Sequence, residues 1–173
     1  MKLILIMALT ADGKIGRTSA HFPDWTEPAD KQLFMSISRE AGVIIMGSKT
    51  FDTLGKPLPG RKHVIITRNK TRHSSGEDLV FTHKKPVEII KDLSAEGYKT
   101  AILAGGARIN TLFARENLID EIFLTYSPKI FGTGLSLFSE SVPMDLELVE
   151  HRRIGENTLL AQYRVVKENV KTG

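Results

Sequence analysis

The chain has 173 residues, of which 41 % are hydrophobic and 25 % charged, and its formal net charge is +4. This length and composition are typical of one globular domain and exclude both a disordered chain and two full domains. The absence of cysteine excludes disulfides, thiolate nucleophiles and cysteine zinc sites, and it suits a reducing compartment. We expect one cytoplasmic domain over residues 1–168 and a short tail at 169–173.

Two classes of partner are not expected. The basic residues are scattered and do not alternate with aromatic residues, which argues against binding to nucleic acid. The apolar run Leu3–Leu9 is too short to span a bilayer, and the turn that follows it is not typical of a signal peptide. We expect a small-molecule substrate, no membrane contact, and either a monomer or a homodimer.

Predicted strands and helices alternate along most of the chain. Short apolar runs predict buried strands at residues 2–10, 43–46, 63–67, 79–81, 100–104 and 121–126. Helical spacing of apolar residues predicts helices at 28–39, from 47 to about 55, from 86 to a C-terminal glycine at 97, and after 106. Residues 146–153 and 159–167 read as an antiparallel hairpin. The pattern predicts an α/β domain with a mostly parallel sheet, helices on both faces and a C-terminal antiparallel hairpin.

The first predicted helix carries a candidate functional carboxylate. Thr26 is a suitable N-cap, and Pro28 suits the first turn. Asp30 lies four residues before Phe34 and therefore on the same apolar face. A carboxylate there is costly to bury without a partner, which favours a pocket residue near Trp25. The alternative is an exposed aspartate that interacts with the helix dipole.

Two glycine turns follow predicted strands, where ligands of α/β sheets bind. The turn Gly47–Thr50 opens a helix with hydroxyl and ammonium donors, which is typical of either anion binding or a simple N-cap. The turn Gly105–Arg108 also opens a helix, but its glycines do not have the dinucleotide GxGxxG spacing. Two interpretations of this turn are open: its glycines let a phosphate approach the backbone N–H groups, or they let the helix pack close to the sheet. The five histidines show no ligand spacing; we expect them on the surface and predict no metal site.

Several segments, in order over residues 1–130, resemble the dihydrofolate reductase family. The most specific is the run GKPLPGR at residues 55–61. The others are ALTADGKIG at 8–16, WTEPAD at 25–30, IMGSKTF at 45–51, VIITRN at 64–69 and AGGARI at 104–109. The resemblance implies reduction of 7,8-dihydrofolate to tetrahydrofolate by hydride transfer from NADPH.

The resemblance also implies roles for individual residues. Asp30 would orient the pterin and assist its protonation. Thr125 would support Asp30 from the strand at 121–126, and Thr125 and Trp25 would be further catalytic residues. Arg61 would bind the glutamate α-carboxylate through two parallel hydrogen bonds. Ala8, Phe34 and Leu58 would line the pocket. The implied cofactor-binding residues are Leu9, Ile15, Gly16, Gly47, Ser48, Lys49, Thr50, Thr67, Arg68, Ala104, Gly105, Gly106, Ala107, Arg108 and Ile109. Residues 17–25 would form a mobile lid, and the Gly105–Gly106 peptide would be cis.

Other features leave the substrate open. Ser48 stands where a basic residue is common in the family, and Asn110 where an aromatic residue is usual. Residues 10–15 and 127–138 are similar to the pyrimidine reductase of riboflavin synthesis, which shares the fold and NADPH but reduces a ribosylamino-pyrimidine phosphate. A third hypothesis is a nucleotide-binding protein without catalysis, against which Asp30 and Arg61 argue. We expect dihydrofolate as the substrate and keep the pyrimidine phosphate as the alternative.

Overall fold

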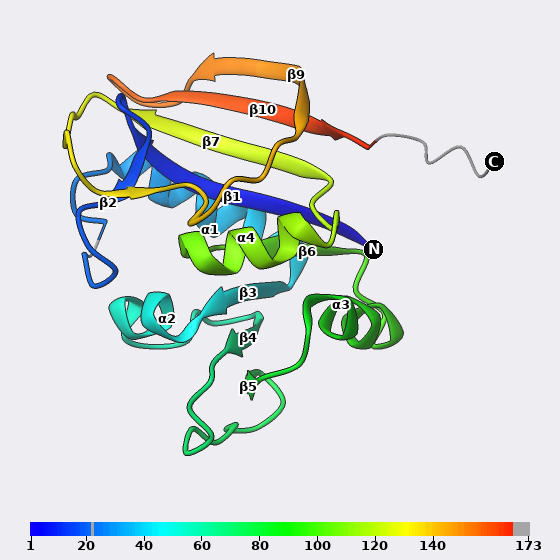
Figure 1. Ribbon diagram of the computed structural model, residues 1–173. Helices are drawn as coiled ribbons and strands as arrows, with labels where there is room; N and C mark the ends of the chain where they lie inside the picture. The colour runs from blue at the N-terminus through cyan, green and yellow to red at the C-terminus, as the bar shows by residue number, and fades with distance from the viewer. Residues whose placement is uncertain (22, 168–173) are drawn as a thin grey trace.

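The computed structural model describes residues 1–21 and 23–167. The predicted tail at 169–173 lies outside these residues. An eight-stranded sheet forms the centre, in the order β5-β4-β3-β6-β1-β7-β10-β9 (Figure 1). Its strands are β1 (Lys2–Thr10), β3 (Val43–Gly47), β4 (Lys62–Ile66), β5 (Leu79–Thr82), β6 (Thr100–Leu103), β7 (Glu121–Ser127), β9 (Asp145–Arg153) and β10 (Leu159–Val166). The helices are α1 (Pro28–Ala41), α2 (Ser48–Leu54), α3 (Pro86–Ala95) and α4 (Ala107–Arg115).

The directions of the strands confirm the predicted architecture. β1 and β3 to β7 pair in parallel, whereas β10 pairs antiparallel with both β7 and β9. A second sheet, formed by β2 (Lys14–Gly16) and β8 (Leu135–Ser136), lies inside segments that we expected to be loops. Strands of two or three residues are too short to show the alternation on which strand prediction depends.

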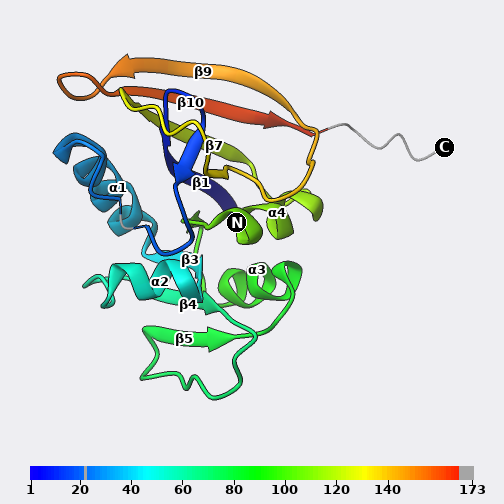
Figure 2. The ribbon, with the colours of Figure 1, turned by 60° about the vertical axis from the view of Figure 1, so that its left-hand side comes forward.

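The helices cover both faces of the sheet, as predicted. Side chains alternate along β1, so Leu3 and Leu5 belong to one core cluster and Ile4 and Ile6 to the other. The first cluster is completed by α3 and α4, and the second by α1 and α2. Figure 2 shows the two pairs of helices on opposite sides of the sheet. None of the helices in the described residues combines the length and the apolar character that a membrane span needs.

Two local expectations are wrong. The N-cap of α1 is Glu27, not Thr26, because the Thr26 hydroxyl donates to the Pro23 carbonyl at 3.3 Å and closes the preceding turn. His63 is fully buried on β4 rather than on the surface. Its Nε2 accepts a hydrogen bond from the Leu58 N–H at 3.1 Å, and its ring lies 6.4 Å from that of Phe51. Burial lowers the pKa of His63.

Candidate active site

The carboxylate of Asp30 meets a buried hydroxyl at the C-terminal end of the sheet. The Thr125 hydroxyl donates to Asp30 Oδ1 at 2.5 Å. Thr125 is fully buried on β7, and its register neighbour on β1 is Ala8. The other oxygen, Oδ2, has no hydrogen-bond partner among the described residues. The half-buried Asp30 is therefore held in place on one side and free to accept N–H groups on the other.

Trp25 lies at the end of the predicted lid and contacts a residue that the sequence did not identify. Its indole packs edge-on against Phe131 at 5.3 Å between ring centroids, and the Arg17 guanidinium lies 4.2 Å from the centre of the same ring. The indole Nε1 is buried without a hydrogen-bond partner in the described part of the chain. Phe131 thus connects both ends of residues 17–25 to the segment after β7. No sequence pattern marks this long-range contact.

Two of the three predicted pocket walls are neighbours of Asp30 or of its partner Thr125: Phe34 lies one helical turn beyond Asp30 on α1, and Ala8 lies opposite Thr125 in the strand register. Phe34 and Leu58 are half-buried and pack against the core cluster that contains Met46 and Phe51. Ala8 is also half-buried and lies beside Thr125 in the strand register. These apolar side chains suit the faces of a flat ring whose polar edge contacts the carboxylate.

Arg61 is more deeply buried than we expected of a ligand-binding cation, with 4 % of its surface exposed. Its guanidinium donates to Ser38 Oγ at 2.6 Å, to the Pro59 carbonyl at 3.2 Å from both Nε and Nη2, and to the Met35 carbonyl at 3.4 Å. Burial and the neighbouring Arg39 lower the pKa of Arg61. No carboxylate pairs with it among the described residues, and one N–H of Nη2 is left. To form two hydrogen bonds to a carboxylate, Arg61 would therefore have to give up one of its bonds to Ser38, Pro59 or Met35.

The two glycine turns lie side by side at the ends of β3 and β6. The Gly47 N–H donates to the Gly105 carbonyl at 2.8 Å, and the Gly105–Gly106 peptide is cis, as the resemblance implies. A Cβ on Gly47 would lie 2.9 Å from a side-chain carbon of Ile109, which leaves no room for a side chain there. Neither α2 nor α4 has a side-chain cap at its first turn. The backbone is thus open to a phosphate at this edge.

The remaining predicted cofactor residues differ in their exposure to solvent. Lys49, Arg68 and Arg108 are exposed and form no salt bridge within the described residues, and Lys49 reaches Ser19 of the lid at 3.4 Å. Lys49 and Arg108 lie in the first turns of α2 and α4, where cations fit the phosphates of a dinucleotide such as NADPH, and Arg68 lies just after β4. Leu9, Ala107 and Ile109 are buried, so they offer mainly backbone atoms. Gly16 is also buried. The others are half-buried, namely Ile15, Ser48, Thr50, Thr67 and Ala104.

Asn110 and Met7 complete this side of the site, although neither was predicted to bind a ligand. Asn110 is fully buried; its Nδ2 donates to the Leu137 carbonyl at 2.9 Å, and its Oδ1 has no partner among the described residues. A Cβ on Gly105 would lie 3.0 Å from Met7 Sδ and 3.7 Å from Asn110 Oδ1. The side chains of Met7 and Asn110 therefore both lie next to Gly105 of the cis peptide. Their positions could have identified them, because Met7 lies near the C-terminal end of β1 and Asn110 lies in the first turn of α4.

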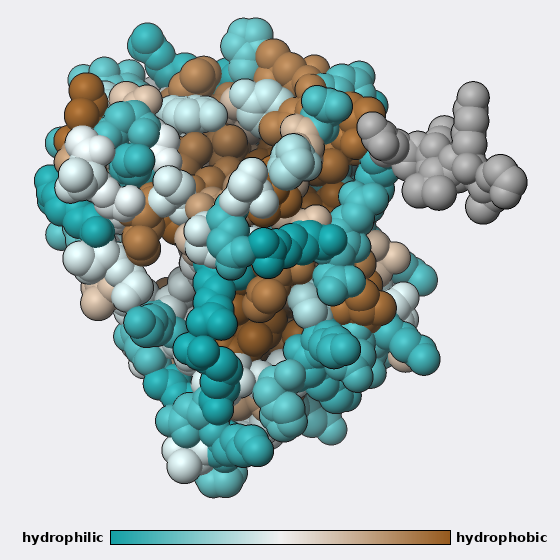
Figure 3. Space-filling model, in the orientation of Figure 1, coloured by the Kyte–Doolittle hydropathy of each residue, from teal (hydrophilic) through white to brown (hydrophobic). Residues whose placement is uncertain are grey.

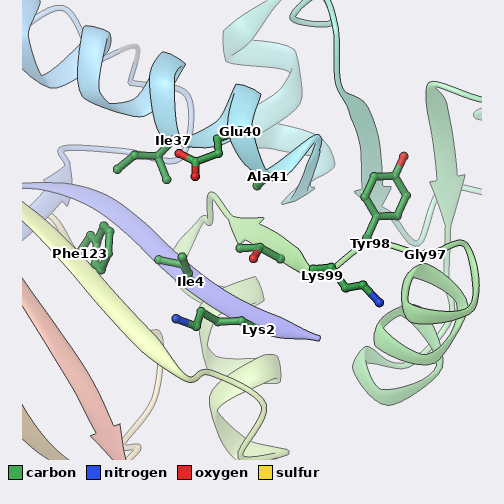
Figure 4. A pocket seen from close by; sticks show the side chains of 10 residues that line it. Lys2, Ile4, Ile37, Glu40, Ala41, Gly97, Tyr98, Lys99 and Phe123 are labelled. Atoms are coloured by element: carbon green, nitrogen blue, oxygen red, sulfur yellow. The ribbon is translucent and has the colours of Figure 1, made fainter.

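A cavity of about 550 Å³ lies elsewhere, at the N-terminal ends of β1 and β6. Figure 4 shows Ile37 and Glu40 of α1 on one side of it, and Ile4 and Phe123 on the other. None of the predicted site residues lines this cavity. It is therefore separate from the candidate active site.

The fold is that of a ligand-binding α/β domain, with two open glycine turns and a carboxylate at the C-terminal edge of its sheet. The family model described as dihydrofolate reductase matches residues 2–158. The chain is 35 % identical over 119 residues to dihydrofolate reductase of Lactococcus lactis subsp. lactis, covering 64 % of this chain and 69 % of that protein. It is 29 % identical over 126 residues to dihydrofolate reductase type 3 of Salmonella typhimurium, covering 73 % and 72 %. The chain belongs to the dihydrofolate reductase family, whose enzymes use NADPH.

Solved structures confirm the fold. A dihydrofolate reductase from Enterococcus faecalis, complexed with NADP(H), has a TM-score of 0.67 at 19 % identity and covers 96 % of this chain and 97 % of its own. A pyrimidine reductase-like protein from Corynebacterium diphtheriae has a TM-score of 0.81 at 16 % identity, with 96 % and 92 % covered. At these identities the likeness concerns the fold alone.

Proposed function

We propose that this protein reduces 7,8-dihydrofolate to tetrahydrofolate with NADPH. The observation that carries the proposal is the Asp30 carboxylate, which Thr125 holds by one oxygen and whose other oxygen has no partner among the described residues. Membership of the dihydrofolate reductase family supports the same reaction. A protein that only bound a nucleotide would gain nothing from a carboxylate in an apolar pocket, because burying that charge is costly.

NADPH supplies a hydride when bound. The open turns at Gly47 and at Gly105–Gly106 would hold its phosphates, and Lys49, Arg68 and Arg108 would neutralise them. Asp30 would accept N–H groups from the edge of the pterin, fix the orientation of the ring and help its nitrogen to acquire a proton. Phe34, Leu58 and Ala8 would exclude water from the two ring faces. Trp25, whose buried indole N–H has no hydrogen-bond partner among the described residues, would donate to the substrate or to a water.

Arg61 is the proposed partner of the glutamate tail. A guanidinium buried without a carboxylate is unfavourable, and an anionic group at its remaining N–H offsets that cost. The carboxylate of a folate tail is such a group.

We propose that the protein acts on this small-molecule substrate in the cytoplasm.

The test is NADPH oxidation by the purified protein in the presence of dihydrofolate, with the product identified as tetrahydrofolate by mass. The Asp30→Asn variant serves as the control, because it changes the carboxylate to an amide of the same size. Product formation that depends on Asp30 supports the proposal. NADPH binding without product formation would leave a nucleotide-binding protein instead.

A further inference from the structure

Glu27 occupies the N-cap position of α1, but its side chain does not cap the helix. N-cap positions favour Ser, Thr, Asp and Asn, whose short side chains reach the first free N–H groups of a helix. The Glu27 carboxylate instead accepts a hydrogen bond from the backbone N–H of Asn157, at 3.0 Å to Oε1 and 3.3 Å to Oε2. The two residues are 130 positions apart in the sequence. A residue type that is poor for its local position thus has a long-range partner.

The turn between β9 and β10 is shaped to accept this carboxylate. The Ile154 N–H donates to the Thr158 carbonyl at 3.0 Å and closes the turn. A Cβ on Gly155 would overlap with Glu27 Oε2 and would lie 3.2 Å from the Cβ of Ala29. Glycine therefore lets the turn approach the start of α1 closely. Figure 2 shows the turn above α1 at the left of the view.

Packing does little to hold the outer strand of this hairpin. All nine residues of β9 are exposed, and its only strand neighbour among the described residues is β10. Leu146, Leu148 and Val149 have 40–54 % of their surface exposed. Figure 3 shows hydrophobic surface over this upper part of the molecule. Because so little of β9 is buried, the hydrogen bond from Asn157 to Glu27 matters for where the turn lies relative to α1.

The same end of α1 carries the carboxylate of the candidate active site. The Asp30 N–H donates to the Glu27 carbonyl at 3.1 Å, and Asp30 accepts the hydrogen bond from Thr125. The residue opposite Thr125 on β10 is Leu160, two residues after Thr158 of the turn. The first turn of α1 is therefore bonded at two points, to the β9–β10 turn through Glu27 and to β7 through Asp30.

We propose that Glu27 is a positioning residue. By accepting the Asn157 N–H it fixes the first turn of α1 against the β9–β10 turn, and it thereby keeps the Asp30 carboxylate in place to bind the substrate. The inference rests on the proposed function, in which Asp30 orients the pterin. A displacement of about 1 Å that starts far from the reacting atoms can lower a rate about 100-fold. The open glycine turns lie at the ends of β3 and β6, so NADPH binding should not depend on Glu27.

Removal of the acceptor tests the role. We expect Glu27→Ala to lower kcat/KM for dihydrofolate by about fivefold or more, while the Kd for NADPH changes by less than about twofold. Glu27→Gln keeps an acceptor oxygen at the same place and should retain most of the activity. Glu147→Ala breaks the exposed pair of Glu147 with Arg164 on the same hairpin and should change neither value. An equal loss in Glu27→Ala and Glu27→Gln, or none in Glu27→Ala, would contradict the proposal.

Gly155 offers a second way to break the same contact. Its backbone is not left-handed, so alanine is not strained there, but the added methyl group would displace the Glu27 carboxylate. We expect Gly155→Ala to lower kcat/KM about as much as Glu27→Ala. The double variant should lose no more than either single one, because both changes remove one contact. Losses that multiply in the double variant would overturn the shared cause.

Hydrogen exchange tests the positioning without a substrate. The exchange of the Asn157 and Asp30 N–H groups is followed by NMR in the natural protein and in the variants. We expect Glu27→Ala to speed exchange at both groups and Glu147→Ala at neither. Unchanged exchange at Asp30 in Glu27→Ala would overturn the proposal, even if activity falls. If the natural protein does not reduce dihydrofolate but shows these exchange changes, the result contradicts the proposed function and supports the positioning of Asp30 by Glu27.

Discussion

Thr125 and Asp30 are 95 residues apart in the sequence, yet the threonine hydroxyl lies 2.5 Å from the aspartate carboxylate. The bond joins β7 to the first turn of α1, across the C-terminal end of the sheet. It uses one carboxylate oxygen and leaves the other without a protein partner among the described residues. This asymmetry suits a group that must hold its position and also bind a substrate.

Replacement of Asp30 tests its chemical role. We expect Asp30→Asn to lower the turnover of dihydrofolate near neutral pH by about 10²–10⁴-fold, the contribution of a positioned acid–base group. NADPH affinity should remain close to that of the natural protein, because the cofactor turns lie on other strands. Steady-state kinetics and NADPH titration measure the two effects. Near-normal turnover would remove Asp30 from the mechanism.

The Thr125 hydroxyl can be removed without a change in side-chain volume. We expect Thr125→Val to lower the kcat/KM for dihydrofolate by about tenfold or more, because hydrogen bonds to charged groups contribute about 1.5–3 kcal/mol. Thr125→Ser keeps the hydroxyl and should retain most activity. If both variants lose activity equally, the packing of Thr125 matters and its bond to Asp30 does not.

The main elements and Asp30 could be predicted from the sequence because each depends on a local pattern. Apolar runs mark the strands of the sheet, and the four-residue spacing of Asp30 and Phe34 places the carboxylate on the inner face of α1. The pairing of Asp30 with Thr125 was different. It followed from a resemblance to a family, since no local pattern connects residues on separate elements.

The features that were missed depend on contacts between distant segments or on very short elements. Phe131 packs against Trp25, and Asp12 holds the segment in place by accepting hydrogen bonds from the N–H groups of Phe131 and Gly132, at 3.1 and 2.8 Å. The hydrogen bond from Thr10 lowers the pKa of Asp12, which favours the charged form of this clamp. His63 was misplaced because its apolar surroundings come from α2 and from the loop before β4.

The preference for NADPH over NADH should depend on Arg68. This residue follows β4, is exposed and has no salt bridge among the described residues, so it is available to the 2′-phosphate that NADH lacks. We expect Arg68→Ala to reduce the preference by about 1–3 kcal/mol. Lys91→Ala, an exposed change on α3, is the control. Equal use of both cofactors by the natural protein would contradict this assignment.

Arg61 should bind the glutamate tail. We expect Arg61→Leu to weaken dihydrofolate binding by about 1.5–3 kcal/mol and to leave NADPH affinity nearly unchanged. Arg39→Leu, which removes the exposed neighbouring cation, should have little effect. Thermal unfolding must accompany the titration, because the variant also loses the Arg61 bond to Ser38. Unaltered dihydrofolate affinity in a folded Arg61→Leu variant would refute the role.

The buried His63 predicts a pH dependence of stability. Its pKa is lowered in the folded state, chiefly by burial, whereas the unfolded chain takes up the proton at about pH 6.5. Below that pH the unfolded state binds more protons, so the free energy of unfolding should fall as the pH decreases, by at most about 1.4 kcal/mol per pH unit. Denaturant unfolding at several pH values should show a weaker decline for His63→Gln. Parallel curves for the two proteins would contradict the prediction.

The most direct test of the proposed reaction compares two substrates in one assay. NADPH oxidation is followed with dihydrofolate and, separately, with the ribosylamino-pyrimidine phosphate of riboflavin synthesis, and kcat/KM is determined for each. We predict a much higher kcat/KM for dihydrofolate, with tetrahydrofolate as the product, because Asp30 and Arg61 match the two ends of that molecule. Oxidation of NADPH with the pyrimidine phosphate alone would contradict the proposal and assign the protein to the other reaction.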